Sequence, residues 1–289
     1  MNDPLHSVPA IRCIASGEQS IVRIVPEETP VALVYDGSTH AVMMATPSDL
    51  EDFALGFSMA EGKVDRADEI AEFEIVEQPS GIELRMWLTP NAGRRIAARR
   101  RALLGPTGCG LCGVESLDAA LPMLPVVAAT RTFTRREISI AVASVASSQV
   151  LNREAHALHA AAFCRPGRMA PLVREDVGRH NALDKLVGAM TRQALAPSDG
   201  IVVLTSRVSV EMVQKTAVLG ASVLAAVSVP TALAIRTAND CGITLVAVAR
   251  ADGFEVFTHP DRLLDGPDRY DPLVLAGRFQ RRGSTHATC

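Results

Sequence analysis

The second half of the chain alternates between short apolar runs and longer amphipathic segments, and this alternation limits the possible folds more than any other feature. The apolar runs, which are typical of buried strands, lie at 200–206, 222–228 and 243–250. Helices are predicted at 135–164, 179–195, 209–219 and 230–239, and a further short strand at 170–174. Repeated strand–helix–strand units favour an α/β fold, with a mostly parallel sheet covered by helices on both faces.

The first half predicts a smaller, β-rich unit with a helix. Strands are expected at 31–45, where two apolar runs flank a turn and indicate a hairpin, and at 72–89. A helix should follow the hairpin, because Thr46 can cap it and Asp49 can return the capping bond.

Three parts of the chain are predicted from these patterns: 1–104 as the β-rich domain, 105–133 as a loop and linker, and 134–289 as the α/β domain. The basic run from Arg94 to Arg101 precedes the loop, as a helix or turn that could bind a partner or form a solvated face. A second capping box, Thr134 with Glu137, marks the start of the last part.

Composition excludes several classes of protein. Apolar residues make up 48% of the 289 residues and aromatic residues 4%, which favours helices on buried strands over a β-sandwich. The formal net charge of -3 does not indicate binding to nucleic acid or membranes. The N-terminus does not resemble a secretory signal, and no run of about 18 apolar residues is present. We therefore expect a cytoplasmic protein whose six cysteines are reduced.

Polar residues follow the predicted parallel strands at the points where these strands end. They are Thr205, Ser206 and Arg207 after the first strand, Ser228 and Thr231 after the second, and Arg250 after the third. Because ligands of open α/β sheets bind beyond the carboxyl ends of the strands, we expect these side chains to share one site. Hydroxyl groups, arginines and helix N-termini favour a phosphate-bearing anion. Ordinary helix caps and solvated arginines are the structural alternative.

His180 lies in a crowded polar segment, 174–190, at the start of a predicted helix. It can donate to a phosphate or carry a proton near pH 7. A helix start held by salt bridges explains the segment equally well.

Two cysteines, Cys109 and Cys112, form a Cys-x-x-Cys pair among glycines. A metal clip, a redox couple and a sulfur carrier are the possible interpretations. A structural zinc site usually has a second cysteine pair, and a redox couple usually begins a helix after a strand; neither pattern is present. The flanking glycines indicate a mobile loop, and nearby arginines would lower the pKa of the thiol. We predict a nucleophilic thiol that moves between two sites.

A zinc site is a further alternative. His156 and His159 are three residues apart on the helix predicted at 135–164, so they would share one face. With the cysteine pair they could supply four ligands, although such histidines are more often core or rim residues.

Several segments of the chain together resemble one family. They are TPSDLEDFALGF, TGCGLCGVESL, LHAAAF, REDVGRHNALDKLVG, LTSRVSVEMVQKTA, SVPTALAI and FTHPDRL. Through them the chain resembles, over nearly its whole length, the FdhD family of sulfur carrier proteins required for formate dehydrogenase activity. The resemblance implies a cytidine-deaminase-like fold for the second half.

The resemblance also implies a function. A cysteine desulfurase would pass sulfur to the loop as a persulfide. The protein would transfer it to the molybdenum bis(molybdopterin guanine dinucleotide) cofactor, which is a bound substrate, and the cofactor would go to formate dehydrogenase. No permanently bound metal is implied. Family members are commonly dimers, so we expect a homodimer.

Residue roles follow from the same resemblance. Cys109 would carry the persulfide and Cys112 would assist it. The guanine dinucleotide would bind the segment formed by Val248, Ala249, Arg250, Ala251, Asp252 and Gly253. The residue pattern adds Ser206, Arg207 and His180 as candidates.

Two other functions stay open at this point. One is a chaperone that escorts the cofactor without chemistry. The other is a zinc-dependent nucleobase deaminase, which would need a His-x-Glu motif that the chain lacks around His156.

Overall fold

The computed structural model describes residues 3–103, 122–168 and 170–265. Its N-terminal part contains a hairpin of β1 (Leu5–Ile14) and β2 (Gly17–Pro26), followed by a four-stranded sheet in the order β4-β3-β6-β5. The strands of this sheet are β3 (Thr29–Tyr35), β4 (Ser38–Ala45), β5 (Ile70–Gln78) and β6 (Gly81–Leu88). The helices are α1 (Leu50–Ala60), the 3-10 helix η1 (Ala67–Glu69) and α2 (Pro90–Leu103).

The C-terminal part is built on a six-stranded sheet in the order β13-β12-β11-β10-β8-β9. Its strands are β8 (His159–Cys164), β9 (Leu172–Asp176), β10 (Ile201–Leu204), β11 (Val223–Ala226), β12 (Thr244–Arg250) and β13 (Gly253–Val256). The helices are α4 (Arg135–Ser148), α5 (Val150–Ala155), α6 (Arg179–Arg192), α7 (Val210–Leu219) and α8 (Ala232–Asp240), with 3-10 turns η2 (Pro197–Asp199) and η3 (Pro260–Arg262). A short pair, β7 (Phe133–Thr134) and β14 (Leu263–Leu264), lies beside it.

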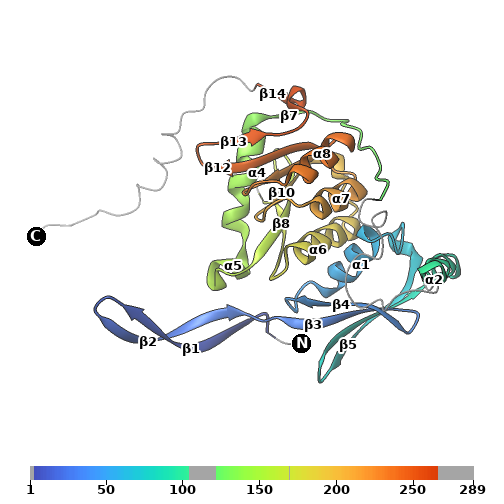
Figure 1. The fold of residues 1–289 in the computed structure, drawn as a ribbon, viewed down its shortest axis with the longest axis horizontal. Helices are drawn as coiled ribbons and strands as arrows, with labels where there is room; N and C mark the ends of the chain where they lie inside the picture. The colour runs from blue at the N-terminus through green and yellow to red at the C-terminus, as the bar shows by residue number, and fades with distance from the viewer. Residues whose placement is uncertain (1–2, 104–121, 169, 266–289) are drawn as a thin grey trace, which may run out of the picture.

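The elements stack in layers (Figure 1). The four-stranded sheet packs on α1 through a core that includes Leu33, Phe53 and Leu84. Helix α1 lies on α6, and α6, α7 and α8 cover one face of the six-stranded sheet. Helix α4 covers the other face through Ile138 and Val145. The structure confirms that the first part of the chain is rich in strands. It also confirms that helices cover both faces of the second sheet.

The six-stranded sheet is mixed, and the prediction of a mostly parallel sheet was wrong. Strands β10, β11 and β12 are parallel. However, β8 pairs antiparallel with β10, β9 with β8, and β13 with β12. Strands β8 and β9, like β12 and β13, are joined by connections too short for a crossover, and such connections reverse the chain direction. The cytidine-deaminase-like topology and the boundaries 1–104, 105–133 and 134–289 stay predictions.

The helix predicted at 135–164 was wrong over its last part. After α4 and α5, the alanine-rich segment 159–164 forms strand β8. Alanine favours helices, but Ala160, Ala161 and Ala162 are buried between the two helical layers, and tertiary packing overrides propensity. His156 follows α5 with a φ of 54°. His156 and His159 therefore do not share a helix face.

The two predicted capping motifs have different outcomes. Thr134 caps α4 as predicted: its hydroxyl accepts from the N–H of Glu137, and the Glu137 carboxylate accepts from the N–H of Thr134 at 2.7 Å. The prediction that Thr46 caps α1 was wrong. Asp49 is the N-cap of α1, in a left-handed conformation and without a side-chain capping bond to any described residue.

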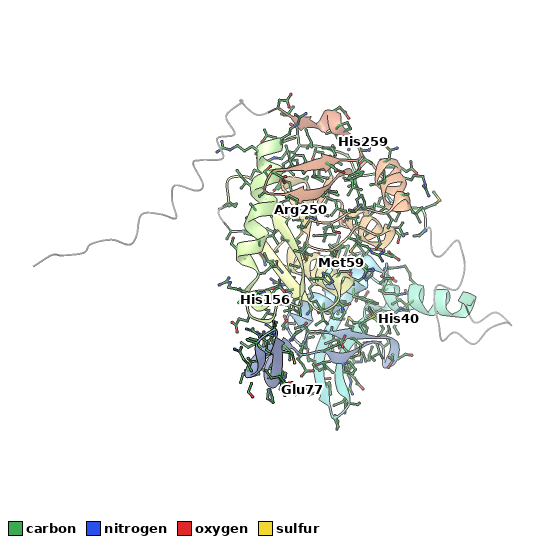
Figure 2. The ribbon with its side chains drawn as sticks, turned by 60° about the vertical axis from the view of Figure 1, so that its left-hand side comes forward. His40, Met59, Glu77, His156, Arg250 and His259 are labelled. Atoms are coloured by element: carbon green, nitrogen blue, oxygen red, sulfur yellow. The ribbon has the colours of Figure 1, made fainter. Side chains whose placement is uncertain are left out.

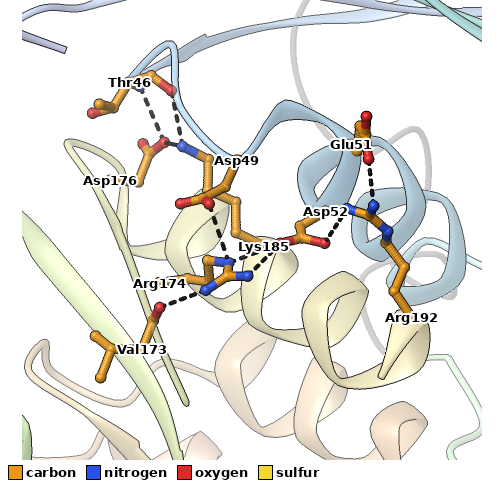
Figure 3. Close-up of polar contacts among 9 residues, drawn as sticks. All are labelled: Thr46, Asp49, Glu51, Asp52, Val173, Arg174, Asp176, Lys185 and Arg192. Atoms are coloured by element: carbon orange, nitrogen blue, oxygen red, sulfur yellow. Dashed lines mark hydrogen bonds and ion pairs between the residues drawn. The ribbon is translucent and has the colours of Figure 1, made fainter. Parts of the chain in front are cut away.

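Thr46 instead belongs to a buried network that joins the two parts (Figure 3). Lys185 is 0% exposed; its Nζ lies 2.6 Å from Asp176 Oδ2 and donates to the carbonyl oxygen of Thr46 at 2.8 Å. The N–H of Thr46 donates to Asp176 at 3.0 Å, and its hydroxyl accepts from the N–H of Val177 at 3.1 Å. Both charges are thus hydrogen-bonded across the interface, as buried charges require.

Asp52 gathers a second set of contacts at the edge of this interface (Figure 3). Arg174 donates to Asp52 Oδ2 through Nε at 2.8 Å and through Nη2 at 2.6 Å, and Arg192 donates to Oδ1 at 3.0 Å. Because Asp52 is on α1 and both arginines come from the C-terminal part, these bonds fix how α1 lies across α6.

Helices α1 and α6 cross at two glycines. A Cβ atom on Gly56 would lie 1.7 Å from the carbonyl oxygen of Asp184, and a Cβ atom on Gly188 would lie 1.9 Å from the carbonyl oxygen of Asp52. Both distances are far shorter than any non-bonded contact. The two backbones therefore touch, and no larger residue fits at either position.

A third polar cluster ties the end of α1 to α6 and α7. Lys215 Nζ lies 2.8 Å from Asp184 Oδ1 and 2.8 Å from Glu61 Oε1. Burial raises the pKa of Asp184 to about 6, against the opposing effect of Lys215. Burial alone would lower the pKa of Lys215, but the charges of Asp184 and Glu61 outweigh it and raise that pKa. The pair is therefore ionised at neutral pH.

Within the described ranges, no helix has the length and apolar character needed to cross a membrane.

We predict that Gly56→Ala destabilises the protein. In an ordinary helix interior this change stabilises by about 0.5–1 kcal/mol. Here the new Cβ would collide with the carbonyl oxygen of Asp184, and overpacking costs about 1–3 kcal/mol. Urea unfolding followed by circular dichroism measures the change. A rise in the free energy of unfolding would contradict the backbone contact.

We predict that Lys215→Met loses about 3–5 kcal/mol of stability at pH 8, because it leaves the Asp184 carboxylate buried without a cation. The loss should be smaller at pH 5. An acid whose pKa is raised in the folded state binds more protons when folded, so stability falls as pH rises from the unfolded value near 4 to the folded value. That folded value is about 6 in the native protein, and the variant moves it higher.

Urea unfolding of Lys215→Met at pH 5 and pH 8 measures this difference. The matched control combines Lys215→Met with Asp184→Asn, which removes the buried carboxylate, keeps Glu61, and should lose most of the pH dependence. Equal losses at the two pH values in the single variant would show that Asp184 does not respond to Lys215.

Candidate functional site

One edge of the six-stranded sheet brings five strands together. Parallel pairing aligns Leu204 of β10 with Ala226 of β11, and β12, whose Val246 lies opposite Ala225, runs past this level to Arg250. Antiparallel pairing places the start of β8 and the end of β9 there too, with His159 opposite Asp176. Helices α6, α7 and α8 begin at this edge because each follows a strand that ends there. The predicted shared edge is confirmed, and β8 and β9 make it wider than the sequence indicated.

Ser206 and Arg207 lie in the loop from β10 to α7. Ser206 is buried, and its hydroxyl donates to the carbonyl oxygen of Arg207 at 3.1 Å. The Arg207 side chain is exposed. The hydroxyl of Thr205 already has a hydrogen-bond partner within the fold, since it accepts from the N–H of Ala160 at 2.8 Å. Arg207 thus offers a charge to a ligand, whereas Thr205 and Ser206 shape the loop.

A β-bulge shapes the end of β12. The pairing of β12 with β13 shifts between Ala247 and Arg250. Val248 has a φ of 54°, a left-handed conformation that is strained for a β-branched residue. Its N–H donates to the carbonyl oxygen of Ser228 at 3.2 Å, so the bulge is bonded to the end of β11. Bulges of this kind occur beside binding sites because they redirect side chains.

Arg250 ends β12 directly after this bulge. It is exposed, and its guanidinium donates to the carbonyl oxygens of Val227 and Ala249. The rest of the segment divides by exposure: Val248 is half-buried against the core, Ala249 is buried, and Ala251, Asp252 and Gly253 are exposed in the turn to β13. The segment thus offers a ligand one guanidinium and an open turn.

His180 lies in the first turn of α6, beside the end of β9. Burial lowers its pKa to about 4, helped by the charges of Arg179 and Lys215 and opposed by Glu211 and Glu61. The imidazole is therefore neutral at pH 7. It can donate one ring N–H to a ligand, but it does not titrate near pH 7 as the sequence suggested.

A polar corner that the sequence did not single out surrounds His180. We call it the α6–α7 corner; it consists of His159, Arg179, His180, Ser209 and Glu211. Burial, followed by the charge of Arg179, lowers the pKa of His159. The same charge contributes to lowering the pKa of His180 and of Glu211. Its Nε is buried and has no hydrogen-bond partner among the described residues.

Ser209 and Glu211 belong to the start of α7. Ser209 is the N-cap and is 8% exposed, yet its hydroxyl makes no hydrogen bond within the described part of the chain. The pKa of Glu211 is lowered, first by the nearby Ser209 hydroxyl and also by His180 and Arg179. The hydroxyl and the carboxylate lie close together without the geometry of a hydrogen bond. The corner therefore joins a guanidinium, a hydroxyl and an ionised carboxylate.

The corner could have been found from the sequence by one signal. Arg179 follows the short strand predicted at 170–174, just as Arg207 follows the strand at 200–206. The rule that ligands collect after strand ends applies to both, once β9 is assigned to the same edge.

The predicted sulfur site, Cys109 and Cys112, lies outside the described residues, and its role stays a prediction. The cysteines within the described ranges are Cys13, Cys164 and Cys241, all free thiols. Burial raises the pKa of Cys164 to about 11 and also raises the pKa of Cys241. Neither buried thiol is a good nucleophile near neutral pH.

The basic run begins on α2, as predicted for a helix. Arg95 donates to both carboxylate oxygens of Glu69 at 2.8 Å and lies 3.2 Å from Asp65, so it holds α2 against η1. Arg94 contacts Asn91. The side chains of Arg99, Arg100 and Arg101 lie outside the described part.

The histidine pair considered for zinc is not assembled. His156 lies after α5 and His159 on β8, and Figure 2 shows His156 below Arg250, toward the N-terminal hairpin. Among the described residues, no group of three or more His, Cys, Asp or Glu side chains could hold a metal ion.

Comparison with known proteins shows which family this chain resembles in sequence. A family model described as "FdhD/NarQ family" matches residues 26–264. The sulfur carrier protein FdhD of Agrobacterium fabrum is 51% identical over 251 residues, which are 86% of this chain and 91% of that protein. Its counterpart in Cupriavidus necator is 48% identical over 261 residues, or 90% of this chain and 91% of that protein.

A solved structure is similar over most of the chain. It is the crystal structure of a protein described as a formate dehydrogenase accessory protein, from Desulfotalea psychrophila. It superposes with a TM-score of 0.70 and 25% sequence identity, covering 91% of this chain and 100% of the other. The match of the family model across 26–264 and the high identity to its members agree with this fold, and the chain belongs to the FdhD/NarQ family.

Proposed function

We propose that this protein is a sulfur carrier that takes persulfide sulfur from a cysteine desulfurase and transfers it to the molybdenum bis(molybdopterin guanine dinucleotide) cofactor for formate dehydrogenase. One observation carries the proposal: the family match spans residues 26–264 and includes the Cys109-x-x-Cys112 pair. Relatives that are about half identical to this chain carry the name sulfur carrier protein.

The proposed chemistry needs a thiol that is available as a thiolate. Cys109 as a thiolate attacks the terminal sulfur of the donor persulfide. A new S–S bond forms at Cys109, the S–S bond of the donor breaks, and the donor cysteine leaves as a thiolate. No oxidant is needed. Cys164 and Cys241 are unsuited to this step, because burial raises the pKa of both thiols.

The sheet edge supports the binding half of the proposal. Arg207 and Arg250 are exposed there, and α7 and α8 begin beside them. Guanidinium groups and helix N-termini favour the phosphates of a dinucleotide. Val248, Ala249, Arg250, Ala251, Asp252 and Gly253 would hold the guanine dinucleotide, with Ser206, Arg207 and His180 farther along the same edge. We place the protein in the cytoplasm as a homodimer.

Sulfur loading is tested by intact-mass measurement after incubation with a cysteine desulfurase and cysteine. The protein should gain one sulfur atom, and Cys109→Ser should not, because it lacks the accepting thiol. Cys13→Ser is the matched control, since Cys13 is an exposed thiol on the β1–β2 hairpin, and it should still gain the sulfur. A Cys109→Ala variant that still matures formate dehydrogenase would indicate a chaperone without sulfur chemistry.

Cofactor binding is tested by hydrogen exchange with added GDP. The amides of 248–253 should exchange more slowly, because this segment includes an exposed turn that the ligand would cover. The turn at Asp36 and Gly37, between β3 and β4, is the internal control and should be unaffected. Unchanged exchange at 248–253 at saturating GDP would argue against this site.

A further inference from the structure

We propose that a polar cavity at one end of the N-terminal sheet binds a linear aliphatic diamine or polyamine. The cavity has a volume of about 300 Å³ and is formed by two segments that are far apart in the sequence, 27–30 and 77–82. Figure 2 shows Glu77 near the lower end of the molecule, well below Arg250. The cavity is therefore separate from the candidate site at the edge of the six-stranded sheet, and the inference does not rest on the proposed function.

The pairing of β3 with β6 holds the two segments together. These strands are parallel, and Val31 lies opposite Ile82, so the starts of both strands lie side by side. A Cβ atom on Gly81 would lie 2.3 Å from the carbonyl oxygen of Pro30, so the two backbones are in contact there. The walls of the cavity are thus fixed before a ligand binds, and binding does not have to order them.

Thr29 provides a buried hydroxyl that the described residues leave without a partner. Thr29 lines the cavity and is 4% exposed, and its hydroxyl makes no hydrogen bond within the described ranges. Because side chains alternate between the faces of a strand, Thr29 shares a face with Val31. Val31 lies opposite Ile82 and Ile82 opposite Glu77, so Glu77 is on that face too. A buried hydroxyl without a partner is costly, and a donor that reaches it is favoured.

Carboxylates on both walls favour a cation. Glu27 and Glu28 come from one segment and Glu77 from the other, whereas no lysine, arginine or histidine of the described chain lines the cavity. Glu27 contacts His6 at 2.8 Å and accepts from the N–H of Glu28 at 2.9 Å. Each carboxylate has about four acceptor positions, so these contacts leave room for further donors. The like charges repel one another, and a bound cation relieves that repulsion.

The spread of the carboxylates favours an extended cation over a metal ion. In the part of the chain that the structure describes, no group of three or more His, Cys, Asp or Glu side chains could hold a metal ion. Glu27, Glu28 and Glu77 therefore do not converge on one point. A chain with an ammonium group at each end can reach both walls at once. Each ammonium has three N–H donors, which suit the carboxylates and the Thr29 hydroxyl.

The test titrates the full-length protein by calorimetry with putrescine and with butylamine. The two probes share the same carbon chain, but putrescine carries an ammonium group at both ends and butylamine at only one. The dissociation constant of putrescine should be lower by about tenfold or more, because its second ammonium adds charge-assisted hydrogen bonds on the opposite wall. Magnesium ion carries the same total charge as putrescine, and an equal concentration of it should not displace putrescine.

Two variants locate the binding. Thr29→Val removes the hydroxyl and keeps the branched shape, and it should weaken putrescine binding about three- to tenfold. Its melting temperature should not fall, because the lost hydroxyl has no partner among the described residues, and this excludes unfolding as the cause. Glu77→Gln should reduce the affinity for putrescine to that for butylamine. Glu72→Gln, at an exposed carboxylate elsewhere on β5, is the matched control and should leave both affinities unchanged.

Equal affinities for putrescine and butylamine would overturn the inference, since one ammonium group would then suffice, as on a lysine side chain. Displacement of putrescine by magnesium would show attraction to any dication instead of a built site. Undetectable binding of putrescine, or full affinity in Thr29→Val, would also refute it.

Discussion

The buried ion pair of Lys185 and Asp176 is the contact on which the arrangement of the whole molecule depends. Two charges without access to water are stable only when their remaining donors and acceptors are also bonded. Thr46 supplies those bonds with its N–H and its carbonyl oxygen. Asp176 also accepts from the N–H of Gly178 and from Asn181, at the start of α6. One carboxylate therefore fixes both the docking of the N-terminal sheet and the position of the helix that begins the α6–α7 corner.

The site edge changes in chemical character along the sheet. After β12 and β10 it offers the exposed guanidinium groups of Arg250 and Arg207, which suit phosphates. At the starts of β8, α6 and α7 it offers neutral histidines and the carboxylate of Glu211. The histidines stay neutral because burial and a nearby guanidinium oppose their protonation.

Local patterns determined what the sequence could predict. The hairpin at 31–45, the strands β10, β11 and β12 and the helices after them were all recognisable, because each has its own periodicity and turn residues. The failures came from contacts between distant residues. Strand β8 is rich in alanine and becomes a strand only when it is buried, and Thr46 is drawn away from its helix by a partner 130 residues later. The β1–β2 hairpin was not predicted, and its exposed Ile11 and Val22 give it no buried face that a pattern could reveal.

The candidate site, like the fold, could be predicted where local patterns determine it and not where distant contacts do. The edge and Arg250 followed from the strand ends, but the bulge at Val248 has no sequence signal, since valine rarely adopts a left-handed conformation. Arg179 and Glu211 were visible as charges near strand ends, but only the pairing of β9 and β8 with β10 brings them to the same edge.

The crossing of α1 and α6 at Gly56 and Gly188 has a consequence beyond stability. Where side chains separate two helices, a substitution can be absorbed by a change of rotamer, and the layers shift by small steps. Where backbones touch, that tolerance is gone, and one added methyl group would lift the whole N-terminal sheet away from α6. Every bond across the interface would lengthen at once, including those that anchor the first turn of α6. Evolution at these two positions is thus constrained by the geometry of a site that neither residue touches.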